Sequence, residues 1–479
     1  MANNMESLIL KIDGIVWGIP LIGLVMAVGI YLTIRLKLLQ VIRLPRALKF
    51  MVKNEEGGTG EVSSFGALCT ALSATIGTGN IVGVATAIVA GGPGALFWMW
   101  LAAFFGMATK YAEGLLAIKY RKIDDKGHVL GGPFYYIENG MGSKFKWLAK
   151  MFAFFGACAG LMGIGTFTQV NGISSSVENY FTNTATYAIF GPEYSLAVII
   201  TGIVVTFCAA LVLIGGIQRI SNFAQVVVPF MAVTYVAICL ILVFNNLDKI
   251  PGALVEIFEG AFGIRAIAGG AIGTIMVAMQ KGIARGIFSN ESGLGSAPIA
   301  AAAAQTKEPV RQGLVSMTGT FIDTIIICTM TGLSIVITGT WNIGLEGVQV
   351  TNAAFQQGLP FDPKVASFLL MICLTFFAFT TIIGWNYYGE RCLEYLTGGN
   401  KKPLKAYRWL YIFAVFIGPY MTISAVWNIA DIFNGLMAFP NLIALIALSG
   451  VVIKESQDYF ERTSKKTIKA AMKAEAENS

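Results

Sequence analysis

The feature that most constrains this chain is a series of long apolar stretches that recurs from residue 15 to residue 453. Each is about 20 residues long, which is enough for a helix to cross the hydrocarbon core of a bilayer. The composition, 55% hydrophobic and 13% charged, excludes a string of soluble domains. We therefore predict an all-α polytopic membrane protein of eleven transmembrane helices, at residues 15–34, 65–90, 95–118, 148–173, 196–215, 223–244, 262–288, 312–338, 365–389, 409–427 and 429–453.

The basic residues predict how these spans are oriented. Segments on one predicted side hold most of the 34 Lys and Arg residues, whereas the segments on the other side hold only Lys11, Lys249, Arg265 and Lys364. Because basic loops stay in the cytoplasm, we expect a plasma-membrane protein with its N-terminus outside and its C-terminus cytoplasmic. This topology also accounts for the net charge of +7, so no nucleic-acid partner is expected.

The residues that would support catalysis or a bound metal are sparse. All seven cysteines lie in apolar stretches without metal-ligand spacing, so neither a disulfide framework nor a zinc site is predicted. The single histidine, His128, falls in a predicted cytoplasmic loop, and Ser292 and Ser296 therefore have no partner for a serine protease mechanism. We expect that the protein is not an enzyme and has no cofactor.

Two spans carry polar or glycine-rich sequence at mid-membrane depth, at residues 73–81 (SATIGTGNI) and 269–274 (GGAIGT). Unwound backbone is tolerated there only where it lines a cavity or is buried in protein. The tripeptide Ile-Gly-Thr, shared by both, carries little weight because residues 164–166 repeat it. The two interruptions predict a five-plus-five inverted repeat. Its first half is residues 63–250, with a helix broken at 73–80, and its second half is residues 251–453, with a helix broken near 269–280. Before them, residues 1–62 are expected to form an extracellular N-terminus, an extra transmembrane helix and a basic cytoplasmic linker, and after them residues 454–479 a charged cytoplasmic tail.

Four motifs in this order resemble those of the alanine/glycine:cation symporters, also called sodium/alanine symporters. They are SATIGTGN at 73–80, GGPGALFWMW at 91–100, GGPFYYIENG at 131–140 and SNESGLGSAP at 289–298. The resemblance implies the leucine-transporter fold with one extra N-terminal helix. It also implies symport of small neutral amino acids, alanine and glycine first, with Na+ as the coupling ion. A channel is the alternative, although a channel normally repeats one filter by symmetry rather than pairing two unlike breaks.

The first interruption predicts the substrate site. Amides at the start of its outer half, around Thr78, Gly79 and Asn80, suit a carboxylate. Tight helix packing is the alternative for these small residues. Bulky side chains near the midplane are expected to form the pocket walls, and buried amides to bind polar groups of the substrate or to tie helices together. The predicted wall residues are Phe167, Met279 and Trp385, and the predicted amides are Gln169 and Gln280. The sequence does not distinguish Gln169 from Asn171, two residues later, as the amide that reaches the site.

The coupling-ion site is predicted beside it. Carbonyl groups near Ser73 and Ile76 end the inner half-helix and suit a hard cation such as Na+. Thr380 and Thr381 offer hydroxyl oxygens, although threonine often bonds back to its own helix. The resemblance implies that these four residues form the sodium site of the fold. Asp323, near the midplane, is a candidate for a second cation, a proton or interhelical hydrogen bonds.

The remaining intramembrane charges, Lys110, Glu113, Lys281 and Arg285, are expected to be gate contacts or snorkelling helix ends rather than ligands. The sequence does not decide whether the coupling ion is Na+ or H+, nor the ion stoichiometry. It also does not decide whether L or D amino acids are selected, whether alanine or glycine is preferred, or what the oligomeric state is.

Overall fold

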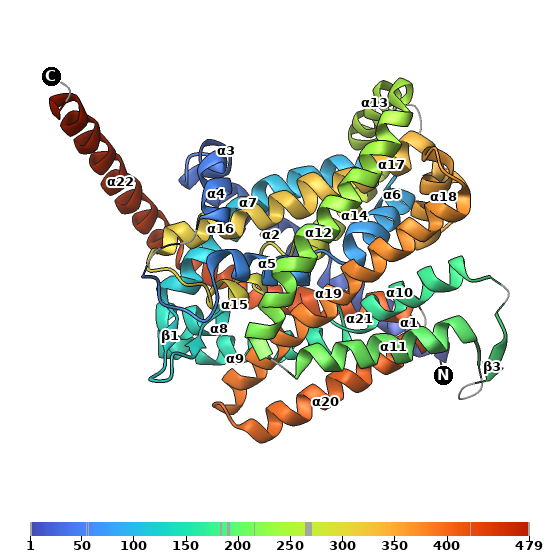
Figure 1. Cartoon of the computed structure of the whole chain (residues 1–479), viewed down its shortest axis with the longest axis horizontal. Coiled ribbons are helices and arrows are strands. Elements are labelled where there is room, and N and C mark those ends of the chain that lie inside the picture. The colour runs from blue at the N-terminus through green and yellow to red at the C-terminus, as the bar shows by residue number, and fades with distance from the viewer. Residues whose placement is uncertain are drawn as a thin grey trace.

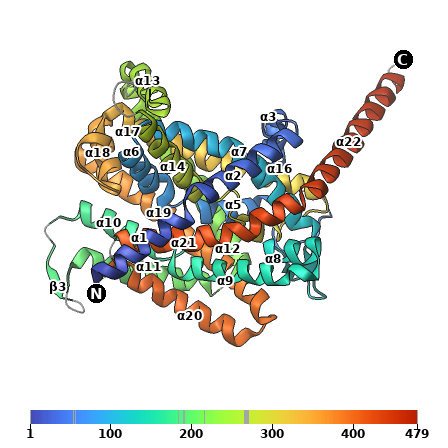
Figure 2. The same cartoon turned by 180° about the vertical axis from the view of Figure 1, so that it is seen from behind.

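The computed structural model describes residues 2–53, 55, 57–182, 184–188, 192–214, 216–263, 271–421 and 423–477. These residues form a bundle of helices with two short antiparallel hairpins. One hairpin, β1 (Lys122–Ile123) with β2 (Val129–Leu130), lies at the end of the bundle from which the C-terminus extends. The other, β3 (Thr186–Ala188) with β4 (Glu193–Ser195), lies at the opposite end, where the N-terminus is found (Figures 1 and 2). We call these the C-terminal end and the N-terminal end of the bundle.

Eight helices within the described residues are long and apolar enough to cross a membrane, or nine when one bent pair is counted as a span. That pair, Ser64–Thr75 and Gly79–Gly91, bends by 53°. The other eight are Leu8–Arg35, Gly94–Lys119, Ser143–Tyr180, Leu196–Leu213, Gly216–Asn245, Pro309–Thr338, Pro363–Thr397 and Val426–Ala447. Two further helices, α14 (Ala271–Asn290) and α20 (Lys401–Ile417), do not meet the same criteria, so the count of eleven stays a prediction.

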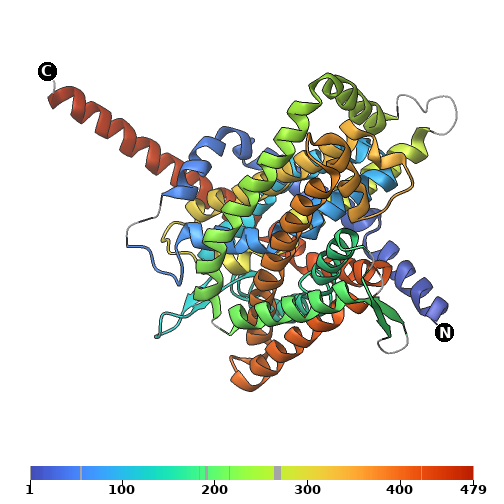
Figure 3. The same ribbon diagram turned by 45° about the vertical axis from the view of Figure 1, so that its right-hand side comes forward.

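Before the first repeat, the chain forms four helices. They are α1 (Ala2–Val16), α2 (Ile19–Arg35), α3 (Leu39–Ile42) and α4 (Leu44–Val52). α2 packs along α7 (Gly94–Lys119) and α21 (Ile423–Ala447), and α4 packs along α16 (Pro309–Thr320). The predicted extra N-terminal segment is thus attached to both repeats. At the other terminus, α22 (Ser449–Glu477) extends from the bundle as one long helix, as Figure 3 also shows.

The first repeat begins with the bent pair. Its inner half α5 (Ser64–Thr75) starts where the Ser63 hydroxyl accepts a hydrogen bond from the Gly66 amide, an N-cap. The chain resumes as a π-helical turn η1 (Gly79–Gly83) and α6 (Val84–Gly91), which ends at Gly92 with φ +71°. The rest of this repeat consists of α7 (Gly94–Lys119), α8 (Pro133–Tyr136), α9 (Lys146–Met162), α10 (Phe167–Tyr180), α11 (Leu196–Leu213) and α12 (Gly216–Asn245).

The second repeat follows α13 (Ile250–Phe262) and begins with α14. After α15 (Ala297–Ala301) comes one long helix, made of α16 (Pro309–Thr320), the π-helical η6 (Phe321–Cys328) and α17 (Thr329–Thr338). The remaining elements are α18 (Val348–Gly358), α19 (Pro363–Thr397), α20, the turn η8 (Gly418–Tyr420) and α21 (Ile423–Ala447). α14 and α16 both pack along α7, while α19 packs against α9 and α10. Helices of the two predicted repeats are therefore interleaved rather than side by side.

The second break was predicted near residues 269–280, but the described part of that range, residues 271–280, is helical without interruption. Residues 264–270 lie outside the described part, residues 271–290 form one continuous helix, and the interruption falls at residues 291–296. There Glu291, Gly293 and Gly295 have φ values of +57°, +87° and +84°. A glycine inside a helix costs only about 1 kcal/mol, so Gly273 does not stop α14. Left-handed residues just before Pro298 do end a helix.

Candidate functional site

Three interruptions of the helical chain meet against α19. The first lies between α5 and η1, the second between α14 and α15, and a third between α9 and α10, at residues 163–166. On α19, the Thr381 hydroxyl donates to the Ile76 carbonyl at the first interruption, with a distance of 3.1 Å. Trp385, one turn further on, donates from its indole N–H to a Glu291 carboxylate oxygen at 2.8 Å. A Cβ on Gly165 would lie 2.6 Å from the Trp385 Cβ, so the third interruption also touches this side chain.

The amides freed at the first interruption are held by side-chain oxygens. The Gly77 N–H donates to Asn80 Oδ1 at 2.8 Å, and the Thr78 N–H donates to Gln169 Oε1 at 3.0 Å. Gln169 in turn donates through Nε2 to the Ile164 carbonyl at 2.9 Å, so it bridges the first and third interruptions. The Thr78 hydroxyl is buried without a hydrogen-bond partner in the described chain. Two N–H groups and a hydroxyl thus form a site suited to a carboxylate.

Four oxygen-bearing residues between α5 and α19 form what we call the α5–α19 cluster, namely Ile76, Phe377, Thr380 and Thr381. Both threonine hydroxyls donate to the Phe377 carbonyl, at 2.9 Å from Thr380 and 3.1 Å from Thr381. Only Thr381 also reaches Ile76, because the Thr380 hydroxyl is directed to Met231 Sδ at 3.6 Å. All these oxygens are hard donors, and none carries a charge, a combination that fits Na+.

Ser73, the remaining residue of the predicted ion site, lies one turn before Ile76 on α5. Its hydroxyl donates to the Thr70 carbonyl at 2.8 Å. A Cβ on Gly384 of α19 would lie 2.8 Å from that hydroxyl, so α5 and α19 are in close contact there. Ser73 therefore faces α19 next to the cluster.

Asp323 is the centre of a second group of oxygens on the other side of the first interruption. We call this group, Asn80, Ser289, Asp323 and Thr324, the Asp323 cluster. Asp323 Oδ1 accepts from Asn80 Nδ2 at 2.7 Å. Its Oδ2 accepts from the hydroxyls of Ser289 and Thr324, at 2.8 and 2.7 Å. Ser289 and Thr324 were not among the predicted site residues, although Ser289 opens the motif at 289–298.

Met279 and Gln280, which were predicted to line the substrate site, lie away from the interruptions along the chain. Both lie inside the continuous helix α14, and Gln280 is ten residues, or about 15 Å, before Asn290 at the second interruption. The Gln280 amide donates to the Trp17 carbonyl of the N-terminal segment at 3.5 Å. Both residues were expected at the substrate site because the second break was placed near residues 269–280.

Phe167, a predicted wall residue, is the first residue of α10, and its backbone packs against Gly418. Two residues later, Gln169 is directed to the first interruption, whereas Asn171 donates to the Met421 carbonyl at 3.0 Å. The structure thus separates two amides that the sequence left hard to distinguish.

A cavity of about 650 Å³ leads toward this site from the N-terminal end of the bundle. Gly172 lines its wall, and a Cβ there would lie 2.5 Å from Thr78 Cγ2, so only one layer of atoms separates the cavity from Thr78. Other lining residues come from η1, α6, α10, α21 and the segment before α18, among them Val82, Thr86, Thr168, Asn171, Trp427 and Gly347.

Aromatic rings and an ion pair border this cavity. The Phe288 and Trp427 rings pack with centroids 5.0 Å apart, and the Arg285 guanidinium lies 4.9 Å from the Trp427 ring. Arg285 also makes a bidentate ion pair with Asp431, at 3.0 and 2.8 Å. Phe288 lies over Gly79, where an added Cβ would be 3.3 Å from the ring. Phe288 thus connects Trp427 at the cavity to Gly79 at the first interruption.

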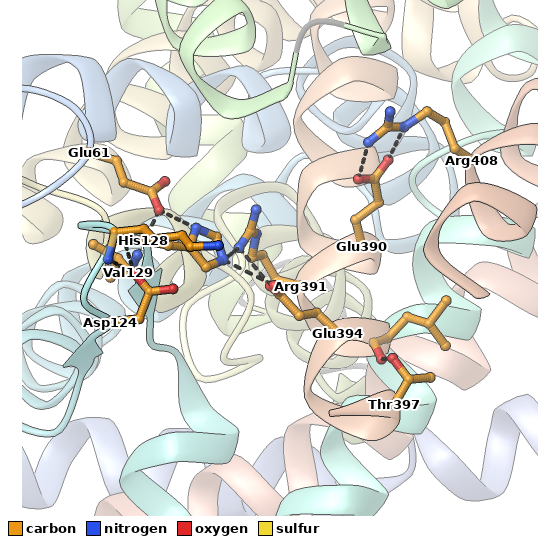
Figure 4. A network of polar contacts seen from close by, with 11 residues as sticks. Glu61, Asp124, His128, Val129, Glu390, Arg391, Glu394, Thr397 and Arg408 are labelled. Atoms are coloured by element: carbon orange, nitrogen blue, oxygen red, sulfur yellow. Dashed lines mark hydrogen bonds and ion pairs between the residues drawn. The ribbon is translucent and has the colours of Figure 1, made fainter. Parts of the chain in front are cut away.

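At the C-terminal end of the bundle, an ion network joins three segments (Figure 4). His128, beside the β1–β2 hairpin, contacts Glu61 before α5 at 2.7 Å and Glu394 of α19 at 3.0 Å. Arg391 pairs with Glu394 at 2.6 Å. The hydrogen bonds to Glu394 and Glu61 raise the pKa of His128 to about 9, against partial burial and the nearby Arg391 charge. His128 therefore joins the linker, the hairpin and α19, and Arg391 Nη1 also lies 2.6 Å from its Nε2.

Lys110 and Glu113 of α7 are not snorkelling helix ends, because both are fully buried against the second interruption. The Lys110 ammonium donates to the Asn290 carbonyl at 2.8 Å. One Glu113 oxygen accepts from the Gly293 and Gly295 amides, at 3.1 and 3.2 Å. These charges stabilise the unwound backbone, a role that the sequence analysis did not assign.

Comparison with known proteins agrees with this geometry. Residues 2–474 match the model of the "Sodium:alanine symporter family". An uncharacterized transporter of Haemophilus influenzae is 55% identical over 461 residues, which cover 96% of this chain and 97% of that protein. The sodium/alanine symporter AgcS of Methanococcus maripaludis is 46% identical over 466 residues, covering 96% and 98%.

The crystal structure of MhsT in complex with L-phenylalanine has the same fold, with a TM-score of 0.57 at 15% identity over 84% of this chain and 93% of that one. The predicted leucine-transporter fold is thereby confirmed. The family consists of transporters and not of enzymes. This chain is therefore a multi-pass membrane transporter that belongs to the sodium:alanine symporter family.

Proposed function

We propose that the protein takes up small neutral amino acids, alanine and glycine first, together with Na+ by alternating access. One observation carries this proposal: the Thr381 hydroxyl meets the Ile76 carbonyl directly beside the two amides of Gly77 and Thr78. A cation and a carboxylate bound there would be neighbours, so each would favour the other electrostatically. Such mutual dependence is what symport requires.

The substrate carboxylate would take the Thr78 amide that Gln169 now holds, with the unpartnered Thr78 hydroxyl as a second donor. Asn80 and Gly79 complete this side of the site. Trp385 and Phe288 limit the space left for the substrate side chain, which favours alanine and glycine over large residues. Phe167 stays a candidate wall at the start of α10.

Na+ would be held by the α5–α19 cluster, with Ser73 one turn away. The Ile76 and Phe377 carbonyls and the Thr381 hydroxyl supply uncharged oxygens, and Thr380 would contribute after a change of rotamer. The Asp323 cluster would hold a second cation or a proton, because its carboxylate is fully buried among donors that a cation can displace.

The distribution of basic residues supports an N-terminus outside and a cytoplasmic C-terminus. The cavity over Thr78 would then open to the outside, and the network around His128 would close the cytoplasmic side. Alternating access requires that the Arg285–Asp431 pair and the His128 network do not open together. One Na+ entering across about 100 mV supplies roughly 2.3 kcal/mol, and a tenfold gradient adds about 1.4 kcal/mol.

The test is alanine uptake by purified protein in liposomes, with Na+ and H+ gradients imposed separately. We expect saturable accumulation with the Na+ gradient alone and collapse of accumulation when the Na+ gradient is dissipated. Accumulation driven by the H+ gradient alone would contradict sodium coupling, and non-saturable flux would indicate a channel. In the same liposomes, alaninamide should compete far more weakly than alanine, because it lacks the carboxylate that pairs with the Thr78 amide.

A further inference from the structure

A second cavity lies far from the transport site, at the C-terminal end of the bundle. Its volume is about 470 Å³, and it is formed where the end of α2, α3 and the exposed part of α22 face one another. Figure 2 shows α3 and the base of α22 at this end of the molecule. The lining is basic and apolar, with Arg35, Lys37, Arg43, Leu36, Leu39, Ile42, Ile453, Ser456, Gln457, Phe460 and Glu461.

The three cations of this groove lack acidic partners in the described chain. None of the salt bridges between described residues includes Arg35, Lys37 or Arg43. Arg35 donates to the Tyr31 hydroxyl at 3.2 Å, and the Arg43 guanidinium lies 4.4 Å from the Phe460 ring. Burial and the charge of Arg46 lower the pKa of Arg43. With Glu461 as the one acidic lining residue, the groove keeps an excess of positive charge.

The groove also lies at the depth of a lipid headgroup. Arg35 is the last residue of the membrane-spanning helix Leu8–Arg35, and basic residues at such an end reach the interface. Beside it, four large apolar side chains are exposed: Ile34 by 68%, Leu38 by 47%, Val41 by 54% and Ile42 by 61%. Water would be a poor solvent for these side chains, but acyl chains would cover them.

We propose that this groove binds one anionic phospholipid, with its phosphodiester between Arg35, Lys37 and Arg43 and its acyl chains along the apolar residues of α2 and α3. Guanidinium and ammonium groups pair with phosphate oxygens, and a groove with a cationic mouth and an apolar flank matches both parts of such a lipid. Because α22 packs against α7 and α16, the bound lipid joins α2 and α3 to both repeats.

The test is native mass spectrometry of the purified full chain, titrated with phosphatidylglycerol or phosphatidylcholine of the same acyl composition. The variant Arg35→Gln, Lys37→Gln, Arg43→Gln removes the three cations. A matched control, Lys401→Gln, Lys402→Gln, Lys405→Gln, removes three exposed cations at the start of α20. A third arm adds inorganic phosphate or soluble glycerol phosphate as competitor, which separates a lipid from a free phosphate ligand. The thermal unfolding midpoint of each variant without added lipid checks that it is folded.

We expect one tightly bound phosphatidylglycerol per chain and at least about tenfold weaker binding in the groove variant, because each interfacial cation contributes favourably to the binding of an anionic lipid. The control should bind as the wild type does. Four results would each overturn the proposal. They are equal binding of phosphatidylcholine and phosphatidylglycerol, equal losses of binding in both variants, unchanged binding in the groove variant, and displacement of the lipid by soluble phosphate.

Discussion

The α5–α19 cluster and the Asp323 cluster lie on two sides of the same interruption, yet they differ in charge. The first consists of carbonyl and hydroxyl oxygens, so it attracts a cation by dipoles alone. The second contains a buried carboxylate that accepts three side-chain hydrogen bonds. An ion that must leave in every transport cycle suits the neutral cluster, since a fixed counter-charge in a low dielectric would hold it more tightly. We infer that the clusters have different tasks, coupling for the first and charge balance for the second.

The largest effect is expected for Thr381→Val. The change keeps the shape of the side chain and deletes the hydroxyl that reaches Ile76, and Na+ cannot recover that ligand from a methyl group. The Na+ concentration for half-maximal alanine uptake should rise at least about tenfold, the loss of one charge-assisted contact. Thr380→Val should shift it less, because that hydroxyl is directed to Met231. Thr375→Val, whose hydroxyl bonds only within α19, is the control and should behave as wild type. Equal sodium dependence in all three variants would remove the cluster from the ion site.

Asp323→Asn should reduce uptake by about tenfold or more. The carboxylate accepts hydrogen bonds from Asn80 and Thr324, whereas the amide nitrogen of an asparagine would face these donors with its own N–H groups. Ser289→Ala removes one of those donors and should cost less. The pH dependence and the Na+ dependence of initial rates separate the two roles of this residue. A variant that loses pH dependence points to a proton, and one whose Na+ dependence loses its cooperativity points to a second Na+. Normal transport by Asp323→Asn would reduce the cluster to a packing contact.

A moderate effect on selectivity is expected at Trp385. Trp385→Ala removes the indole that donates to Glu291, so leucine should begin to compete with alanine. The truncation also costs stability, about 3–5 kcal/mol for a buried aromatic side chain. Trp385→Phe keeps most of the ring and loses only the N–H bond to Glu291, so it should keep wild-type exclusion of leucine. If leucine fails to compete in a folded Trp385→Ala protein, Trp385 is not a wall of the pocket.

The smallest effect concerns the network at the C-terminal end. The pKa of His128 is raised from 6.5 to about 9, so its contribution to stability is complete below pH 6.5 and is lost as the pH rises through 9. The unfolding midpoint of the wild type should fall by about 2–4 °C between pH 7 and pH 10 relative to His128→Gln. Parallel curves for the two proteins would show that the imidazolium does not hold the hairpin to α19.

The sequence was sufficient to predict the helical class and the first interruption, and the resemblance predicted the fold, whereas the bounds of the two repeats stay a prediction. At residues 76–80 the glycines alternate with the polar residues Thr78 and Asn80, and this combination indicates a break. At residues 269–274 the glycines alone suggested one, but α14 continues through Gly273. The real second break has left-handed residues and Pro298, a stronger signal that was available in the motif at 289–298. The third interruption was not predicted, although Ile164-Gly165-Thr166 repeats the tripeptide of the two spans that were expected to break.

The site was less accessible than the fold. Pairing between Thr381 and Ile76 could be expected from their residue types and the resemblance, whereas the partners of Asp323 depend on how η6 packs against α14 and the first interruption. The sequence likewise cannot separate Gln169 from Asn171, because only the turn between α9 and α10 decides which amide is directed to Thr78.

The central claim is that the α5–α19 cluster couples Na+ to the amino acid, and equilibrium binding tests it most directly. Alanine affinity would be measured by isothermal titration calorimetry on purified wild-type and Thr381→Val protein, each at zero and saturating Na+, with Na+ titrated in the reverse order. In the wild type, Na+ should tighten alanine binding, and alanine should tighten Na+ binding by the same factor. In Thr381→Val both factors should shrink together toward one, while alanine still binds without Na+. An unchanged coupling factor in the folded variant would contradict the account.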